Sequence, residues 1–220
     1  MSKLDKVFAG YRPNWDWAGM QGTRACLKWN VRDLYSLDLA LRHTKGRKAA
    51  IQAGGNLGLF AKRLAEEFRQ VFTFEPDKVL FAQLEHNAPE ANIVPVCAAL
   101  GCSRDPVRME CGRRDDSGRA VHEGLTYVAG AGDTPQILID DLELPALNLI
   151  YLDIEGYELN ALRGAEKTVA RCQPTIAVES NGNARHYGSD KKQLAKWFGL
   201  HSYRKVVRIH GDDIYVPLSK

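Results

Sequence analysis

The sequence has few of the features that mark secreted proteins, proteins stabilised by a structural metal ion, or membrane-spanning proteins. Its five cysteines are an odd number, and no two of them form a Cys-x-x-Cys pair. This pattern argues against a disulfide framework or a structural zinc site. No apolar run approaches the roughly 18 residues that a membrane span needs. The N-terminus also lacks the apolar stretch of a signal peptide, so we expect neither a membrane span nor a leader.

An excess of charge of one sign is also missing. The 30 lysines and arginines against 27 aspartates and glutamates leave a formal net charge of +3. Such a mildly basic balance does not call for a nucleic-acid partner. Internal repeats and low-complexity segments are absent too. The 220 residues, 45% of them hydrophobic, can form a stable buried core without disulfide bonds or structural metal ions. We therefore expect a reduced, soluble, cytoplasmic protein.

After residue 47, short apolar runs alternate with amphipathic ones, which is typical of a parallel sheet with helices on both faces. Strands are predicted at residues 48–53, 71–75, 92–99, 147–153 and 174–179. Helices are predicted at residues 57–69, 78–87, 157–171 and 190–198. Pro95 favours an edge position for the third strand. The prediction is a doubly wound, Rossmann-like α/β sheet with five parallel strands.

Three stretches depart from this alternation. Residues 104–111 and 125–129 predict a hairpin across the polar stretch 112–124, followed by a helix or turn at 135–142. Residues 201–209 and 213–218 predict a C-terminal antiparallel hairpin. Residues 1–46 precede the first strand and hold Tyr11, Trp15, Trp17 and Trp29. We interpret residues 1–46 as an aromatic and helical cap segment, with the helix at 23–43, and residues 47–220 as the main domain.

A glycine-rich turn, Gly54-Gly55-Asn56-Leu57-Gly58, follows the first predicted strand. Glycine permits positive φ and lets a ligand approach the backbone. The last glycine comes too early for the dinucleotide pattern Gly-x-Gly-x-x-Gly. Glu75 ends the next strand, where a carboxylate can accept hydrogen bonds from ribose hydroxyls. Together these features predict a ribose-containing cofactor, and the alternative is a turn that serves only helix–strand packing.

Four motifs together resemble the FkbM-type methyltransferase family. They are the turn just described, Phe74-Glu75-Pro76, Leu152-Asp153-Ile154-Glu155-Gly156-Tyr157-Glu158 with Leu162-Arg163-Gly164-Ala165, and Pro174-Thr175-Ile176-Ala177-Val178-Glu179. The resemblance covers residues 48 to 217, and the block that begins at Leu152 is its most specific part. It implies a class I methyltransferase fold, S-adenosylmethionine as cofactor, and methyl transfer to an oxygen, often a sugar hydroxyl.

One position departs from the family pattern. The family usually has an acidic residue where this chain has Gln52, and that carboxylate helps to position the cofactor's amino end. The Gln52 amide oxygen can still accept a hydrogen bond, but it carries no charge. We include Gln52 in the predicted cofactor site. Its residues are Gln52, Gly54, Gly55, Asn56, Gly58, Glu75, Pro76, Ala98 and Asp153.

Three carboxylates are expected to converge near the transferred methyl group. Asp153 ends the fourth strand with Glu155 just beyond it, and Glu179 ends the fifth. Ligands of open α/β sheets bind beyond these strand ends, and a hydroxyl acceptor needs a proton acceptor nearby. We predict all three as catalytic, with Asp153 as general base or acceptor-orienting group, and no metal ligand. Alternatively, Asp153, Glu179 and Asn181 hold a divalent metal, or Glu155 and Glu158 only cap the following helix.

Other chemistry-bearing residues leave alternatives open. His186, in the loop after the fifth strand, is either a base or simply solvated. Three aromatic residues, Tyr11, Trp15 and Trp17, either stack on a sugar or base as a lid over the site or fill an apolar gap. Five arginines crowd the first hairpin and suit either an acidic substrate or, with the acidic residues between them, a solvated surface: Arg104, Arg108, Arg113, Arg114 and Arg119.

The leading functional prediction is S-adenosylmethionine-dependent O-methylation of a hydroxyl on a sugar, glycan or other small molecule, with no membrane or nucleic-acid partner. Methylation of a nucleic acid or a protein is the second hypothesis. The Asn-Pro-Pro-Tyr type of signature for amino-base methylation is absent where Leu152-Asp153-Ile154-Glu155 stands, which disfavours it. A non-catalytic binding module with the same fold is the third, because of Gln52. The oligomeric state stays open.

Overall fold

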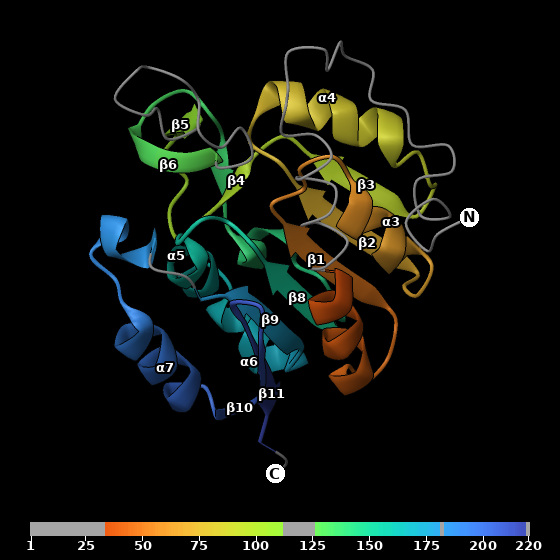
Figure 1. Ribbon diagram of the computed structural model, residues 1–220, viewed down its shortest axis with the longest axis vertical. Helices are drawn as coiled ribbons and strands as arrows, with labels where there is room; N and C mark the ends of the chain where they lie inside the picture. Colours follow the sequence, from red (N-terminus) through yellow and green to blue (C-terminus); the bar gives the residue numbers. More distant parts are fainter. Residues whose placement is uncertain (1–33, 112–125, 181–182, 219–220) are drawn as a thin grey trace.

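The computed structural model describes residues 34–111, 126–180 and 183–218 (Figure 1). Its centre is a seven-stranded sheet in the order β10-β11-β9-β8-β1-β2-β3. Five of these strands are parallel to one another: β1 (Ala49–Ala53), β2 (Gln70–Phe74), β3 (Ile93–Val96), β8 (Leu149–Leu152) and β9 (Thr175–Glu179). The hairpin of β10 (Tyr203–Ile209) and β11 (Asp212–Pro217) joins antiparallel to β9. The predicted five parallel strands and C-terminal hairpin are confirmed, and Pro95 lies on the edge strand β3.

Side chains of the central strands alternate between two apolar cores, one on each face of the sheet. In β1, Ala49 and Ile51 belong to one core and Ala50 to the other. The first face is covered by α5 (Glu158–Arg163), α6 (Glu166–Cys172) and α7 (Lys191–Leu200). The second is covered by α3 (Leu59–Ala65) and the helix at residues 34–43. Because strands such as β1 and β8 are buried along their whole length, the sequence shows them as continuous apolar runs.

The single helix predicted at residues 157–171 is in fact two helices, α5 and α6. A distant segment interrupts it: the Asp140 N–H donates to the Gly164 carbonyl at 2.9 Å. The Asp140 carboxylate then accepts hydrogen bonds from the backbone N–H groups of Lys167 and Thr168. Asp140 therefore serves as the N-terminal cap of α6 in place of a local residue. A side chain at Gly164 would collide with the Gly101 carbonyl, so the close approach requires glycine.

The chain between β3 and β8 leaves the main sheet. The predicted third strand, residues 92–99, stops at Val96, and Ala99–Leu100 forms β4, which pairs with β7 (Gln136–Ile137) instead. The predicted first hairpin is present as β5 (Val107–Cys111) and β6 (Thr126–Ala131), drawn in green in Figure 1. Its connection, residues 112–125, lies outside the described residues. The helix or turn predicted at 135–142 is β7 followed by the 3₁₀ helix η2 (Ile139–Leu142).

Part of the predicted N-terminal cap segment is visible. Residues 34–43 are helical and bury Leu37, Ala40 and Leu41 against the sheet. The aromatic part with Trp15 and Trp17, and the start of the predicted helix, lie outside the described residues. In the part of the chain that the structure describes, no helix is both long and apolar enough to cross a membrane.

Candidate active site

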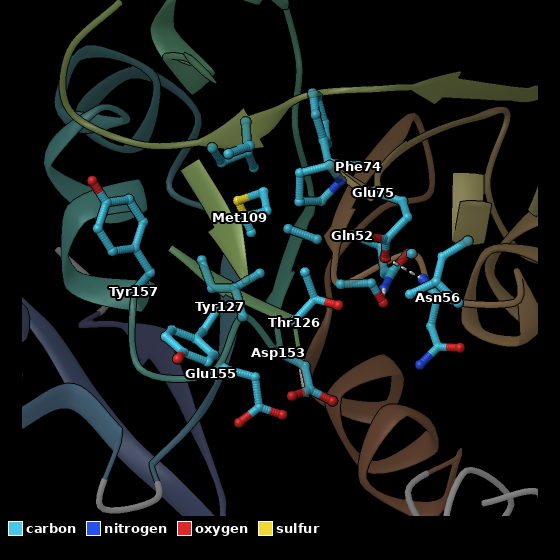
Figure 2. A pocket seen from close by; sticks show the side chains of 18 of the residues that line it. Gln52, Asn56, Phe74, Glu75, Met109, Thr126, Tyr127, Asp153, Glu155 and Tyr157 are labelled. Carbon is cyan, nitrogen blue, oxygen red and sulfur yellow. Dashed lines mark hydrogen bonds between the residues drawn. The ribbon is translucent and has the colours of Figure 1, made fainter. Parts of the chain in front are cut away.

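A cleft opens at the carboxyl ends of β1, β2 and β8 (Figure 2). It encloses about 930 Å³ of empty space, part of it open to solvent. Its walls come from the glycine turn after β1, the end of β2, the segment that leads into β4, the β5–β6 hairpin and the loop after β8. This is the end of an open α/β sheet at which ligands bind. All predicted cofactor-binding residues line it except Gly58.

The glycine turn is held close to its neighbours by the absence of side chains. The N–H groups of Gly54 and Gly55 both donate to the Phe74 carbonyl, at 3.1 and 2.8 Å. Gly54 has φ +84°, and a Cβ there would lie 2.0 Å from the Asp153 carbonyl oxygen. Glycine at this position therefore brings the turn against the ends of β2 and β8 at once. At Gly58, a Cβ would lie 3.1 Å from the Cβ of Ala88, the residue that follows α4 (Lys78–Asn87), so the role of this glycine is close packing against the end of α4.

Glu75 is a buried carboxylate in the cleft wall. It is 3% exposed. Its Oε2 accepts a hydrogen bond from the Asn56 N–H at 2.7 Å, and its Oε1 accepts one from the Asp77 N–H at 2.9 Å; the first is dashed in Figure 2. Burial raises the pKa of Glu75 to about 7. A carboxylate has about four lone-pair sites, so this group, fixed by two backbone donors, can accept further hydrogen bonds from a ligand in the cleft.

Gln52 ties the glycine turn to β2. The side chain is 1% exposed. Its amide nitrogen donates to the Gly54 carbonyl at 2.7 Å, and its amide oxygen accepts from the Thr73 hydroxyl at 2.5 Å. A carboxylate in the same place could not donate to Gly54, because an ionised carboxylate is an acceptor only. The departure from the family pattern thus has a local structural reason.

The three predicted carboxylates are brought together. Oxygen atoms of Asp153, Glu155 and Glu179 lie within 4.8 Å of one another. Asp153 and Glu155 line the cleft (Figure 2), whereas Glu179 lines a smaller hollow next to it. Glu155 has φ +55°, a conformation that non-glycine residues rarely adopt and that often marks functional loops. We name Asp153, Glu155 and Glu179 the carboxylate cluster.

The environment of the carboxylate cluster favours bound protons. Burial raises the pKa of Asp153 well above its usual range, and the negative charges of Glu179 and Asp212 add to the rise. Burial, with the charges of Glu155 and Glu158, raises the pKa of Glu179 to about 8. A side-chain hydrogen bond joins Asp153 and Glu179. At neutral pH this pair therefore holds at least one proton between its two carboxyl groups.

Glu158 holds the loop on which Glu155 lies. It is 3% exposed, and its Oε1 accepts hydrogen bonds from the backbone N–H groups of Ile154 and Gly156, at 3.2 and 3.1 Å. Burial raises its pKa to about 7. The alternative of a purely structural role therefore fits Glu158. Glu155, by contrast, opens into the cleft.

Other residues at the site were not predicted from the sequence. Tyr127, from the β5–β6 hairpin, and Tyr157, after β8, line the cleft (Figure 2). Behind the cluster, the Tyr151 hydroxyl donates to the buried Asp212 carboxylate at 2.7 Å. The polar pair Asp212-Asp213 at the start of an apolar strand was the one sequence signal for this contact.

Of the remaining candidates, the two arginines that the structure describes do not line the cleft. Arg104 forms an ion pair with Asp141, and Arg108 forms one with Glu110. Both arginines are largely exposed, which supports the interpretation of this cluster as a solvated surface. Three of its arginines and one candidate metal ligand lie outside the described residues, as does the side chain of His186: Arg113, Arg114, Arg119 and Asn181.

Comparison with known proteins identifies the family. The sequence profile of the methyltransferase FkbM domain matches residues 52–205, from the end of β1 into β10. The chain belongs to the FkbM methyltransferase family. It is therefore an S-adenosylmethionine-dependent methyltransferase, and the match begins at Gln52, just before the glycine turn.

Individual FkbM-type and other methyltransferases resemble the chain in sequence or fold. The hexuronic acid methyltransferase AglP of Haloferax volcanii is 27% identical over 177 residues, which cover 76% of this chain and 70% of that protein. The crystal structure of an FkbM methyltransferase from Methylobacillus flagellatus matches with a TM-score of 0.52 and 16% identity. That match covers 77% of this chain but only 43% of the other, so the chain spans less than half of that protein.

A third likeness concerns the fold alone. A ribosomal protein L11 methylase from Lactobacillus delbrueckii subsp. bulgaricus matches with a TM-score of 0.51 at 8% identity, over 85% of this chain and 78% of that one. Together with the sheet order, these structures confirm the class I methyltransferase fold.

Proposed function

We propose that this enzyme transfers the methyl group of S-adenosylmethionine to a hydroxyl oxygen of a sugar, in a glycan that contains uronic acid. The observation that carries the proposal is the carboxylate cluster, which opens into the same cleft as Glu75. A relative that acts on hexuronic acid supports the class of acceptor. The tyrosines in the wall, Tyr127 and Tyr157, support it as well, because aromatic rings offer an apolar surface with a polar edge to a ligand.

The residues of the cleft fit the cofactor. Glu75, already fixed by two backbone donors, would accept hydrogen bonds from the ribose hydroxyls. The turn from Gly54 to Asn56 would form the adjoining wall of the cofactor site. Pro76 and Ala98 would flank the base. When bound, the cofactor supplies an electrophilic methyl group on a positively charged sulfur. The negative charge of the carboxylate cluster complements that charge.

The carboxylate cluster would act on the acceptor. The acceptor hydroxyl donates a hydrogen bond to an Asp153 carboxylate oxygen, which orients the hydroxyl oxygen toward the methyl group. The same Asp153 oxygen takes the proton as the hydroxyl oxygen is methylated, and Glu179 shares it through the hydrogen bond between the two groups. Glu155, on its left-handed turn, would hold a neighbouring hydroxyl of the sugar.

The spacing within the carboxylate cluster would also suit a hard divalent cation. We propose that transfer needs no cation. The proton in the Asp153–Glu179 hydrogen bond already reduces the negative charge that a cation would balance. Dialysis against EDTA separates the two cases. Full activity in EDTA fits the proposal, whereas activity that is lost in EDTA and restored by Mg²⁺ would assign the cluster to a metal.

A transfer assay with radiolabelled S-adenosylmethionine tests the proposed function. Oligogalacturonate, maltotriose, RNA and a protein mixture are offered in parallel. We expect label on the uronate glycan, in an alkali-stable form, since a methyl ether resists mild alkali and a methyl ester does not. Alkali-labile label would move the acceptor from hydroxyl to carboxylate. Label on RNA or protein alone would contradict the proposal, and cofactor binding without any transfer would favour a binding module.

A further inference from the structure

A shallow groove beside the cleft carries an excess of positive charge. It is lined by Arg185, Lys192 and Lys196, together with Ser189 and Asp190. These residues come from the 3₁₀ helix η3 (Asn183–Tyr187), from the first two turns of α7 and from the link between them, drawn in blue in Figure 1. The three cations are exposed, and none forms an ion pair with another residue that the structure describes. We name this the basic groove.

The basic groove lies next to the site. A narrow hollow is lined by Glu179, Ser189 and Asp190, and the last two also line the groove. η3 reaches the cleft directly, because the Tyr187 ring packs edge-on against Tyr157 with 4.9 Å between ring centroids. The narrow hollow is too small to hold a sugar, so a chain of sugars with one unit in the cleft would reach the groove over the surface of η3.

Asp190 offsets only one of the three positive charges that line the groove, and its carboxylate also serves as a helix cap. Its Oδ1 accepts a hydrogen bond from the Gln193 N–H at 2.8 Å, and the Gln193 side chain accepts one from the Asp190 N–H at 3.0 Å. The cap offsets the positive end of the helix dipole. Lys192 and Lys196 are one turn apart on the same face of α7, so both project beside Arg185 into one groove.

We propose that the basic groove binds an anionic group of the acceptor, a carboxylate or a phosphate, on a unit beyond the sugar that is methylated. This inference rests on the proposed function. The carboxylate cluster repels an anion inside the cleft, so a charged acceptor must place its anion elsewhere. A guanidinium and two ammonium groups provide the hydrogen-bond donors that carboxylate and phosphate oxygens accept.

Calorimetry on the full chain, independent of turnover, tests the basic groove. Oligogalacturonate probes carboxylate binding, inorganic pyrophosphate probes phosphate binding, and maltotriose is the neutral probe. We expect Lys192→Gln/Lys196→Gln to weaken binding of at least one anionic probe by roughly 3- to 30-fold, the effect of two partly exposed charges. Affinity for S-adenosylmethionine should not change. The matched control, Lys45→Gln/Lys48→Gln, removes two exposed charges next to the start of β1.

The outcomes separate this inference from the proposed function. Loss of anion binding in the groove variant alone supports the inference, and the probe that binds tells carboxylate from phosphate. Equal loss in the control variant, or no binding of either anion to the wild-type chain, overturns it. Methyl transfer to maltotriose as fast as to oligogalacturonate would be consistent with sugar methylation. It would overturn the proposal that the basic groove binds an anionic group of the acceptor.

Discussion

Asp153 and Glu179 have raised pKa values because burial and neighbouring carboxylates make a second negative charge costly. Replacement of Asp153 by Asn keeps the shape of the side chain but removes its capacity to take a proton. We expect Asp153→Asn to lower kcat/KM by about 10²–10⁴-fold, the usual contribution of a general base. Affinity for the cofactor should stay within a few-fold of wild type. Steady-state kinetics and calorimetry check this, and unchanged turnover would remove Asp153 from the mechanism.

The rate of transfer should depend on the protonation of the Asp153–Glu179 pair. Below the pKa of Glu179, about 8, the Glu179 carboxyl group is mostly protonated, so it cannot share a proton that Asp153 takes up. Above it the pair carries a negative charge and can act as a base. We therefore expect kcat/KM to rise with pH and to level off above about 8, and Glu179→Gln to abolish this inflection. A flat profile between pH 6 and 9 in the wild-type enzyme would refute the assignment.

Gln52 offers a test of the turn itself. Gln52→Glu removes the donor to the Gly54 carbonyl and places a charge at a buried position. We expect it to lower the free energy of unfolding by about 1–3 kcal/mol, the cost of a buried group left without its partner. The same substitution at the exposed Gln70 should change it by less than about 0.5 kcal/mol. Chemical denaturation measures both, and equal effects would show that the Gln52 contacts do not stabilise the turn.

Prediction from sequence succeeded where a residue's role follows from its place at a strand end. Glu75 and the carboxylate cluster end or follow parallel strands, so their convergence could be foreseen. The contacts of Gln52 could not, because Thr73 lies on the neighbouring strand and no local pattern marks the pair. The same holds for Tyr151 and Asp212, which meet only after β11 has joined the sheet.

At the scale of elements, the loop between β8 and α5 depends on a buried carboxyl group. Burial raises the pKa of Glu158 from its ordinary value of 4.5 to about 7. The folded state thus binds this proton more tightly than the unfolded state. The stability it contributes is fully present below pH 4.5 and is lost as pH rises through about 7.

Glu158→Gln should make this part of the stability independent of pH. Its amide oxygen can replace Oε1, which accepts both backbone hydrogen bonds. We expect the variant to be more stable than wild type at pH 8, by about 1–3 kcal/mol, and equally stable near pH 4.5. Thermal unfolding at both pH values measures this, with Glu166→Gln at the exposed start of α6 as the control. A variant less stable than wild type at pH 8 would contradict the account.

Helix boundaries show where local patterns stop being informative. The apolar periodicity of residues 157–171 is continuous, yet the helix breaks at Gly164 because Asp140 donates to its carbonyl and caps α6. Likewise, the predicted third strand ends early because Ala99 pairs with β7 rather than with β2. Both differences come from contacts between segments far apart in the chain.

At the scale of the whole molecule, the alternation of strands and helices was enough to predict the fold class and the parallel sheet. The strand order was not predictable in the same way, since it depends on how crossovers pack. The β5–β6 hairpin was predicted as a hairpin, but its position over the cleft, where it contributes Met109 and Tyr127, follows only from the three-dimensional structure. It completes the wall of the cleft in which we propose that cofactor and acceptor bind.

We propose that S-adenosylmethionine binds in the cleft between the glycine turn and Glu75, and the function of the whole molecule depends on this site. Calorimetric titration of wild type and Glu75→Ala with S-adenosylmethionine tests it directly, with thermal unfolding to confirm that the variant folds. We expect one cofactor per wild-type chain and an affinity lower by about tenfold or more in the variant, the effect of losing charge-assisted hydrogen bonds. Absence of binding at millimolar cofactor, or equal affinity in a folded Glu75→Ala variant, would contradict it.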